Sequence, residues 1–262
     1  MGSATTQALA ATASALDAAK GVTVEVAGEL FAVARAIDGS IQLSGALADP
    51  SVPAEVRADA AAKVFGSASA PTVEIVRSAV SQRWSRSADL VAGLEDLGIR
   101  AASIGAGKAD VAGELFEVSG VIAGSPELEL ALGSRLGDSE AKSALVQRIL
   151  GSEISEATSL IVSSLVRNPR GRRVRQLLTH ASDVVSAQRG QLVATVHSAA
   201  PITATRQKRL RTALSERYGT DVTLHIVIDP AVLGGLRVQV GDDVIDGSIS
   251  ARLAELRTKL AA

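Results

Sequence analysis

Apolar residues recur at intervals of three and four through most of the chain. The spacing is clearest in two sets: Val26, Leu30, Val33 and Ile37, and Val111, Leu115, Val118 and Ile122. Such spacing places apolar side chains along one face of a helix. Breaks with proline fall at 49–53, 69–71 and 124–126, where proline forbids an inner helical hydrogen bond. The pattern therefore predicts bundles of short helices.

These helical stretches belong to an internal repeat. Gly28-Glu29-Leu30-Phe31 recurs 85 residues later as Gly113-Glu114-Leu115-Phe116, and the same offset aligns 54–66 with 139–151. A repeat of this length indicates a duplicated structural unit. We therefore expect two related helical bundles, 1–103 and 86–188. Later helices are expected at 72–84 and 153–166, and a helix over 87–102 would serve both bundles.

The apolar period changes to two near Gln191. Alternating residues predict strands around 192–196, 222–228 and 236–240, and a return strand at 244–245. Between the first two, a helix opens at Thr203 and ends at Gly219, and a last amphipathic helix runs from Ser248 to Leu260. The chain is thus expected to be mostly α with a small C-terminal α/β domain, 189–262, in which helices flank a short mixed β-sheet.

Composition narrows the function classes. The 27 Lys and Arg residues nearly cancel the 28 Asp and Glu residues, so the net charge gives no reason to collect nucleic acid or an anionic membrane. Five aromatic residues make base stacking a poor hypothesis, and the absence of cysteine excludes disulfides and thiolate metal sites. We predict no membrane span and no signal peptide, so the partners are expected to be proteins.

No catalytic or cofactor pattern is found. His180, His197 and His225 fall on different elements without carboxylates at metal-ligand spacing. The segment 103–108 resembles a phosphate loop but has Ala102 and Ala109 where that motif requires glycine and Ser or Thr. We therefore predict no catalytic residues, no metal and no cofactor.

A basic run offers the main alternative. Five arginines lie between Arg167 and Arg175, enough to neutralise several phosphates. The run sits at a Pro-Gly helix junction and lacks interleaved aromatic residues, which favours a solvated or protein-contacting surface. A nucleic-acid-associated helical protein remains the alternative hypothesis, and an enzyme acting through the α/β domain is a third.

The segment 229–248, followed by Arg252-Leu253, closely resembles the C-terminal signature of F-type ATP synthase delta subunits. These are the bacterial counterparts of the mitochondrial oligomycin-sensitivity-conferring protein. Gln188-Arg189-Gly190 and 196–203 are similar to that family's entry into the domain. The duplicated helical part resembles the long actinobacterial form. The signature residues are Asp229, Pro230, Leu233, Gly234, Gly235, Arg237, Gly241, Asp246, Gly247, Ser248, Arg252 and Leu253.

The resemblance implies a non-catalytic stator subunit at the cytoplasmic face of the plasma membrane. Such a subunit links the N-terminal segments of the catalytic-head alpha subunits to the ends of the stalk b subunits. By analogy with the family's first and fifth helices, 4–16 and 72–84 are expected to form the alpha-subunit groove. The candidate groove residues are Leu9, Leu16, Val73, Val76, Val80 and Trp84.

Overall fold

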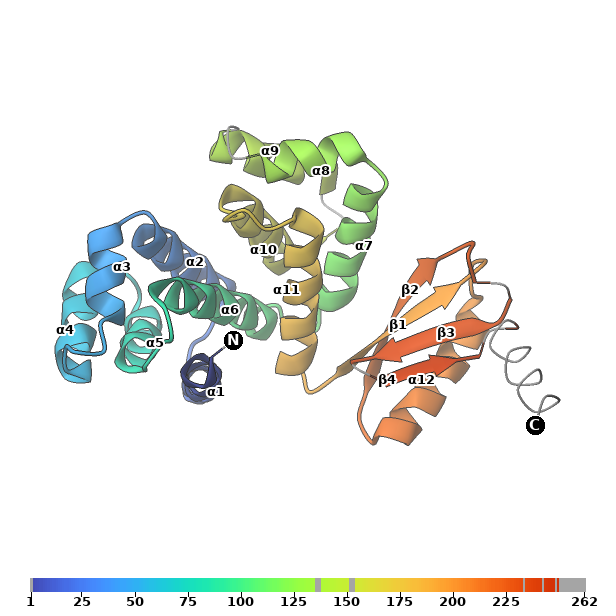
Figure 1. The fold of residues 1–262 in the computed structure, drawn as a ribbon, viewed down its shortest axis with the longest axis horizontal. Helices are drawn as coiled ribbons and strands as arrows, with labels where there is room; N and C mark the ends of the chain where they lie inside the picture. Colours follow the sequence, from blue (N-terminus) through green and yellow to red (C-terminus); the bar gives the residue numbers. More distant parts are fainter. Residues whose placement is uncertain are drawn as a thin grey trace. The chain divides into compact units, whose positions relative to one another are not determined.

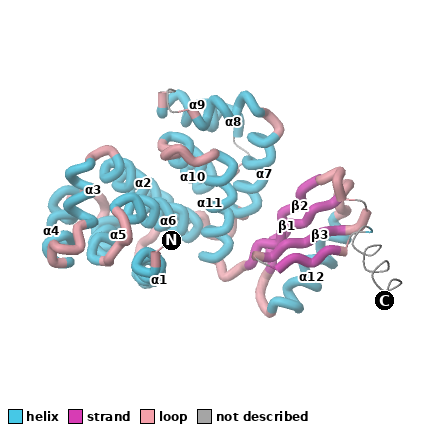
Figure 2. The backbone as a smooth tube through the Cα atoms, in the orientation of Figure 1, coloured by secondary structure: helices cyan, strands magenta, loops and turns pink. Residues whose placement is uncertain are grey.

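The computed structural model describes residues 2–134, 138–150, 154–232, 234–241, 243–247 and 249. This described part contains twelve helices and four strands (Figure 1). The chain divides into two compact units, Met1–Val185 and Ser186–Ala262. Helices make up the first unit, and the second holds the sheet (Figure 2). The predicted fold class, mostly α with a small α/β part, is confirmed.

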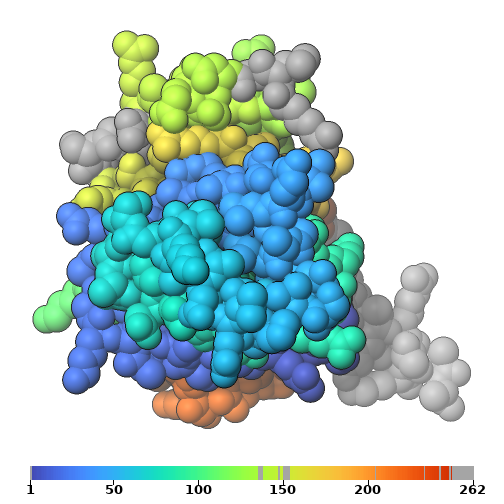
Figure 3. Space-filling view, turned by 90° about the vertical axis from the view of Figure 1, so that its left-hand side faces the viewer, coloured from blue at the N-terminus to red at the C-terminus, as the bar shows by residue number. Residues whose placement is uncertain are grey.

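The helical unit consists of eleven successive helices, the last of which crosses the unit boundary. They are α1 (Ser3–Ala18), α2 (Val24–Asp38), α3 (Ile41–Ala48), α4 (Ala54–Val64), α5 (Ala70–Ser81), α6 (Ser87–Gly105), α7 (Val111–Ala123), α8 (Pro126–Gly133), α9 (Ser139–Leu150), α10 (Glu156–Arg167) and α11 (Val174–Gln188). The early helices, blue to cyan, cover the face seen in Figure 3. Both predicted apolar sets are buried in one continuous core.

The repeat is visible in the helices themselves. Helices α2–α5 correspond in order to α7–α10, with starting points of α3 and α8 separated by the same 85 residues as the sequence match. Ser40 caps α3 by accepting a hydrogen bond from the Leu43 amide, and Ser125 caps α8 in the same way through Leu128. Caps of this type stabilise a helix by about 1 kcal/mol. Helix α6 contacts α2 of the first repeat and α10 of the second.

Two predicted helix boundaries were wrong. The helix expected over 153–166 is α10, which begins at Glu156 after its N-cap residue Ser155. The helix expected over 72–84 is α5, which ends at Ser81, and Trp84 lies in the connection to α6. The Trp84 indole N–H donates to the Ala79 carbonyl at 2.8 Å, a carbonyl near the end of α5 that also accepts from the Gln82 amide. A Cβ at Gly93 would lie 2.2 Å from the Trp84 ring, so only glycine leaves room for the indole.

The second unit is a four-stranded sheet with a crossover helix. The strands are β1 (Leu192–Ser198), β2 (Val222–Ile228), β3 (Leu236–Val240) and β4 (Asp243–Asp246), in the order β2-β1-β3-β4. β1 and β2 are parallel and are joined through α12 (Ala204–Tyr218), while β3 is antiparallel to both β1 and β4. The four predicted strands are confirmed.

The sheet core follows the predicted alternation on β1 beyond Leu192, which is exposed, but β2 departs from it, since His225 is buried and Ile228 is exposed. Ala194 and Val196 on β1 are buried, and so is Leu214 on α12. Gly219 ends α12 with φ 69°, the left-handed conformation that glycine adopts without steric cost. Thr203 precedes α12 without capping it through its side chain. The predicted helix from Ser248 to Leu260 lies outside the described residues except for Ile249.

Candidate functional site

The predicted groove residues lie on α1, on α5 and in the connection that follows α5. Four of the six belong to the bundle core: Leu16, Val76, Val80 and Trp84. Leu9 and Val73 are half-buried, and α1 packs against α5. Leu9 and Val73 are therefore the members of the set that reach the surface along this helix pair.

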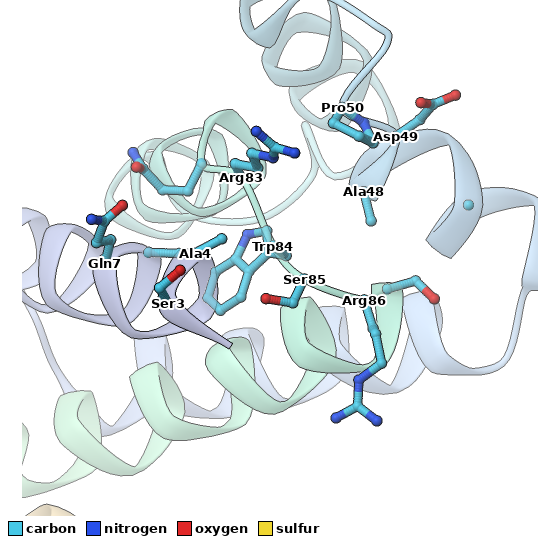
Figure 4. A pocket seen from close by; sticks show the side chains of 14 residues that line it. Ser3, Ala4, Gln7, Ala48, Asp49, Pro50, Arg83, Trp84, Ser85 and Arg86 are labelled. Atoms are coloured by element: carbon cyan, nitrogen blue, oxygen red, sulfur yellow. The ribbon is translucent and has the colours of Figure 1, made fainter. Parts of the chain in front are cut away.

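An open hollow of about 730 Å³ is formed by the first turns of α1, the end of α3 and the connection from α5 to α6 (Figure 4). Gln7, Asp49, Arg83 and Arg86 bring polar groups to its lining, and Trp84 borders it. Its mixed polar and apolar lining suits recognition of a peptide.

Helix α1 is fixed to the start of α6 by hydrogen bonds. Thr5 Oγ1 donates to Asp89 Oδ2 at 2.8 Å and accepts from the Ser85 amide at 3.2 Å. Arg86 pairs with the other carboxylate oxygen at 2.8 Å. Burial raises the pKa of Asp89, but the hydrogen bonds from Arg86 and Thr5 outweigh it and the net pKa lies below the ordinary value.

The two repeats share a carboxylate clamp that the sequence reasoning missed. Glu29 on α2 accepts hydrogen bonds from the Ser69 amide and hydroxyl and from the Thr72 hydroxyl at the start of α5. The pKa of Glu29 is lowered, because these hydrogen bonds outweigh the effect of burial.

In the second repeat, Glu114 accepts the same three hydrogen bonds from Ser155 and Thr158 at the start of α10. The sequence carried an indication of this clamp, since in each repeat the Gly-Glu-Leu-Phe motif is followed about 40 residues after its glutamate by a Ser-x-x-Thr motif. A carboxylate at a helix N-terminus is favoured by the free amides there. The clamp thus fixes the docking of α5 and α10 in both repeats.

A buried cation occupies the same position in each repeat. Arg57, 5% exposed, donates to the carbonyls of Leu47, Val52, Ser81 and Gln82 at 3.0 to 3.3 Å. Lys142, 85 residues later and 7% exposed, donates to the Ser134 carbonyl after α8. Carbonyls at the ends of helices carry partial negative charge and attract cations. Arg57 therefore joins the ends of α3 and α5 beside the hollow.

The basic run is engaged in contacts within the chain. Arg170 and Arg172 share the buried carboxylate of Glu95 on α6, the Arg172 contact measuring 2.7 Å. Arg167 pairs with Glu140 and Arg175 with Glu129. Four of the five arginines thus pair with three carboxylates of the chain, which weakens the nucleic-acid hypothesis.

The histidines form no metal centre. His180 Nε2 lies 2.7 Å from Asp96 Oδ1, and this hydrogen bond raises the pKa of His180. His197 Nδ1 lies 3.8 Å from Asp229 Oδ2, and His225 is buried on β2. The described residues contain no group of three His, Asp or Glu side chains that could hold a metal ion.

The described signature residues shape the turns of the sheet unit. Gly234, Gly235 and Gly241 have positive φ, which glycine permits. Asp229 accepts from the Ala231 amide at 2.9 Å in the turn that contains Pro230. Arg237 and Asp246 are partners across β3 and β4, and the Gly247 amide donates to Leu236. Leu233, Ser248, Arg252 and Leu253 lie outside the described residues.

No helix in the described ranges combines the length and apolar character needed to cross a membrane.

Comparison with known proteins gives a consistent result. The model of the family described as "ATP synthase delta (OSCP) subunit" matches residues 100–260, from the end of α6 onward. A protein named "ATP synthase subunit delta" from Leifsonia xyli subsp. xyli is 44% identical over 264 residues, covering 100% of both chains. A protein of the same name from Streptomyces avermitilis is 40% identical, and the match covers 91% of this chain and 89% of that protein.

A chain in the cryo-EM structure of the Toxoplasma gondii mitochondrial ATP synthase hexamer is also similar. It has a TM-score of 0.40 and 24% identity, covering 64% of this chain and 98% of that one.

Proposed function

We infer the function of this chain from the family to which it belongs, the ATP synthase delta (OSCP) subunits. The observation that carries this inference is the similarity to delta subunits over the whole length of both chains. The chain is accordingly a subunit of the peripheral stalk, the stator of ATP synthase. Its role is to connect other subunits mechanically, and this role requires binding surfaces on a packed scaffold.

We assign three parts to this role: the first bundle, 1–103, the second bundle, 86–188, and the C-terminal domain, 189–262, with α6 shared by the bundles. The first bundle takes the N-terminal helix of an alpha subunit at α1 and α5, and the C-terminal domain meets the ends of the b subunits through the signature segment. The chain has no catalytic residues or cofactor and lies at the cytoplasmic face of the plasma membrane through the complex.

Half-buried Leu9 and Val73 support the location of the alpha-subunit site. An amphipathic helix that lies along α1 and α5 would cover both side chains, and helix-in-groove recognition obtains affinity from such apolar burial. The contacts of Thr5 and Arg57 hold the walls of this site in place. A pre-organised groove loses less entropy on binding.

Calorimetric titration with a synthetic peptide of the same organism's alpha-subunit N-terminus tests this function. The full chain is expected to bind the peptide, and Val73→Glu to weaken binding by about 30-fold, because burial of an unpaired carboxylate costs about 2 kcal/mol or more. Ser159→Glu, at the same repeat position on α10, is the matched control and should bind normally. Absence of binding by the folded wild-type chain would contradict the proposed head contact.

A further inference from the structure

Helices α5 and α10 have three corresponding neighbours each, and they differ in the fourth. In chain order, α6 comes before α7 in the second repeat as α1 comes before α2 in the first, so α6 is the counterpart of α1. The neighbours α9, α6 and α7 of α10 correspond to the neighbours α4, α1 and α2 of α5, whose fourth neighbour is α6, the helix that follows it in the chain. In addition, α10 contacts α2, which belongs to the first repeat. Because α2 also packs along α6, it contacts both helices of the α6–α10 pair, which corresponds to the α1–α5 pair of the first repeat (Figure 1).

The contacts of α2 with α10 extend along both helices. A Cβ at Gly28 would lie 3.8 Å from Cδ1 of Leu160, so a small residue faces Leu160. Near the other end, Asn168 Nδ2 donates to Asp38 Oδ2 at 2.8 Å. Since Gly28 faces Leu160 and Asp38 faces Asn168, the two helices run in the same direction.

The face of α10 that carries Leu160 is largely covered, although Leu160 itself is half-buried. Ser163 and Ser164, one turn further along the helix, are only 7% and 8% exposed. These positions follow the i, i+3, i+4 spacing of one helix face. A partner helix therefore has no access to this face unless α2 leaves it.

The same positions on α5 are more exposed. Glu74, 86 residues before Leu160, is exposed, and Arg77 and Ser78 are half-buried. Arg77 pairs with Asp59 at 3.0 Å, and the two side chains are 41% and 63% exposed. The α5 face thus lacks the cover that α2 provides on α10.

We propose that α2 occupies the helix-binding groove of the second repeat, between α6 and α10. The duplicated chain then offers one vacant groove, between α1 and α5, which binds one partner helix. The identity of that helix as an alpha-subunit N-terminus rests on the proposed function. The partner is an amphipathic helix whose apolar face covers Leu9 and Val73. In the occupied groove, Leu160 at this repeat position faces Gly28. Because the vacant groove has the carboxylate of Glu74 instead, the partner residue opposite Glu74 is basic.

Displacement of α2 by an external helix is strongly opposed. Leu30 and Phe31 of α2 are buried in the first-repeat core, at 0% and 2% exposure. Removal of α2 would expose these side chains, and each fully buried side chain of this size contributes about 1.5–3 kcal/mol. Tethering within one chain also gives α2 a high effective concentration at the groove.

Cysteine labelling tests the occupancy of the groove without any partner. The chain has no cysteine, so Glu74→Cys and Leu160→Cys each introduce one thiol at the same repeat position. In the folded full-length chain, Glu74→Cys is expected to react with a maleimide at least about tenfold faster than Leu160→Cys, since α2 covers only the latter. Equal rates in folded proteins would overturn the proposal.

Peptide titration tests the number of vacant grooves. The full chain is expected to bind one alpha-subunit N-terminal peptide, with unchanged affinity after copper-phenanthroline oxidation links Gly28→Cys to Leu160→Cys in a disulfide and locks α2 in place. Two peptides per chain, or loss of binding in the locked chain, would overturn the proposal. If the wild type binds no peptide but the labelling rates differ as expected, the proposed function fails and the occupied groove stands.

Discussion

Glu95→Gln is expected to destabilise the helical unit by about 3 kcal/mol, because it leaves two arginines without their shared counter-charge. Glu95 is 6% exposed, and its partners Arg170 and Arg172 come from the connection between α10 and α11. Arg170 has φ 49°, a left-handed conformation that costs a non-glycine residue about 1–2 kcal/mol. The ion pairs therefore hold a strained segment against α6.

Urea unfolding of the full chain, followed by far-ultraviolet circular dichroism, measures this change. Glu129→Gln is the matched control, because Glu129 meets Arg175 in a more exposed pair, with side chains 25% and 47% exposed. Its loss should cost less than about 1 kcal/mol. If Glu95→Gln also costs less than this, the buried cluster does not hold the connection to α6.

Arg57→Met is expected to cost about 3 kcal/mol or more. The substitution keeps an apolar stem of similar length but removes the donors to four carbonyls in a 5% exposed site. Each buried acceptor left without a partner costs about 1–3 kcal/mol, reduced where water can enter. The ends of α3 and α5 should therefore loosen together.

Arg57→Lys provides the control, since the second repeat already uses Lys142 at this position. It retains the charge and part of the donor set, and should recover at least half of the stability lost in Arg57→Met. Thermal unfolding of the two variants beside the wild type makes the comparison. Equal losses in both would show that the guanidinium geometry, and not the buried cation, is what the site requires.

Periodicity predicted the helices and strands because burial of one face is a local property of the sequence. Leu30 and Val196 are buried where the period of three to four and the period of two place them. The same logic explains the groove residues. Helical spacing selects side chains that face the core, and for that reason Leu16 and Val76 are buried instead of lining an open surface.

The contacts between distant elements could not be predicted in this way. Periodicity gives no partner for Glu29, which the fold places beside Ser69. Arg57 binds backbone carbonyls, and no sequence motif predicts such contacts. Glu95 lies 75 residues before Arg170, so the run of arginines gave no indication of its partner. The place of α2 on α10 likewise depends on packing between repeats.

The central claim, that this chain couples head and stalk as a stator, is tested most directly by ATP-driven proton pumping. Membranes carrying the same organism's ATP synthase would be stripped of this chain and assayed before and after the purified full chain is added back. Pumping is expected to be lost on stripping and restored by the wild type, which alone hydrolyses no ATP. Full pumping by membranes that lack the chain would contradict the account.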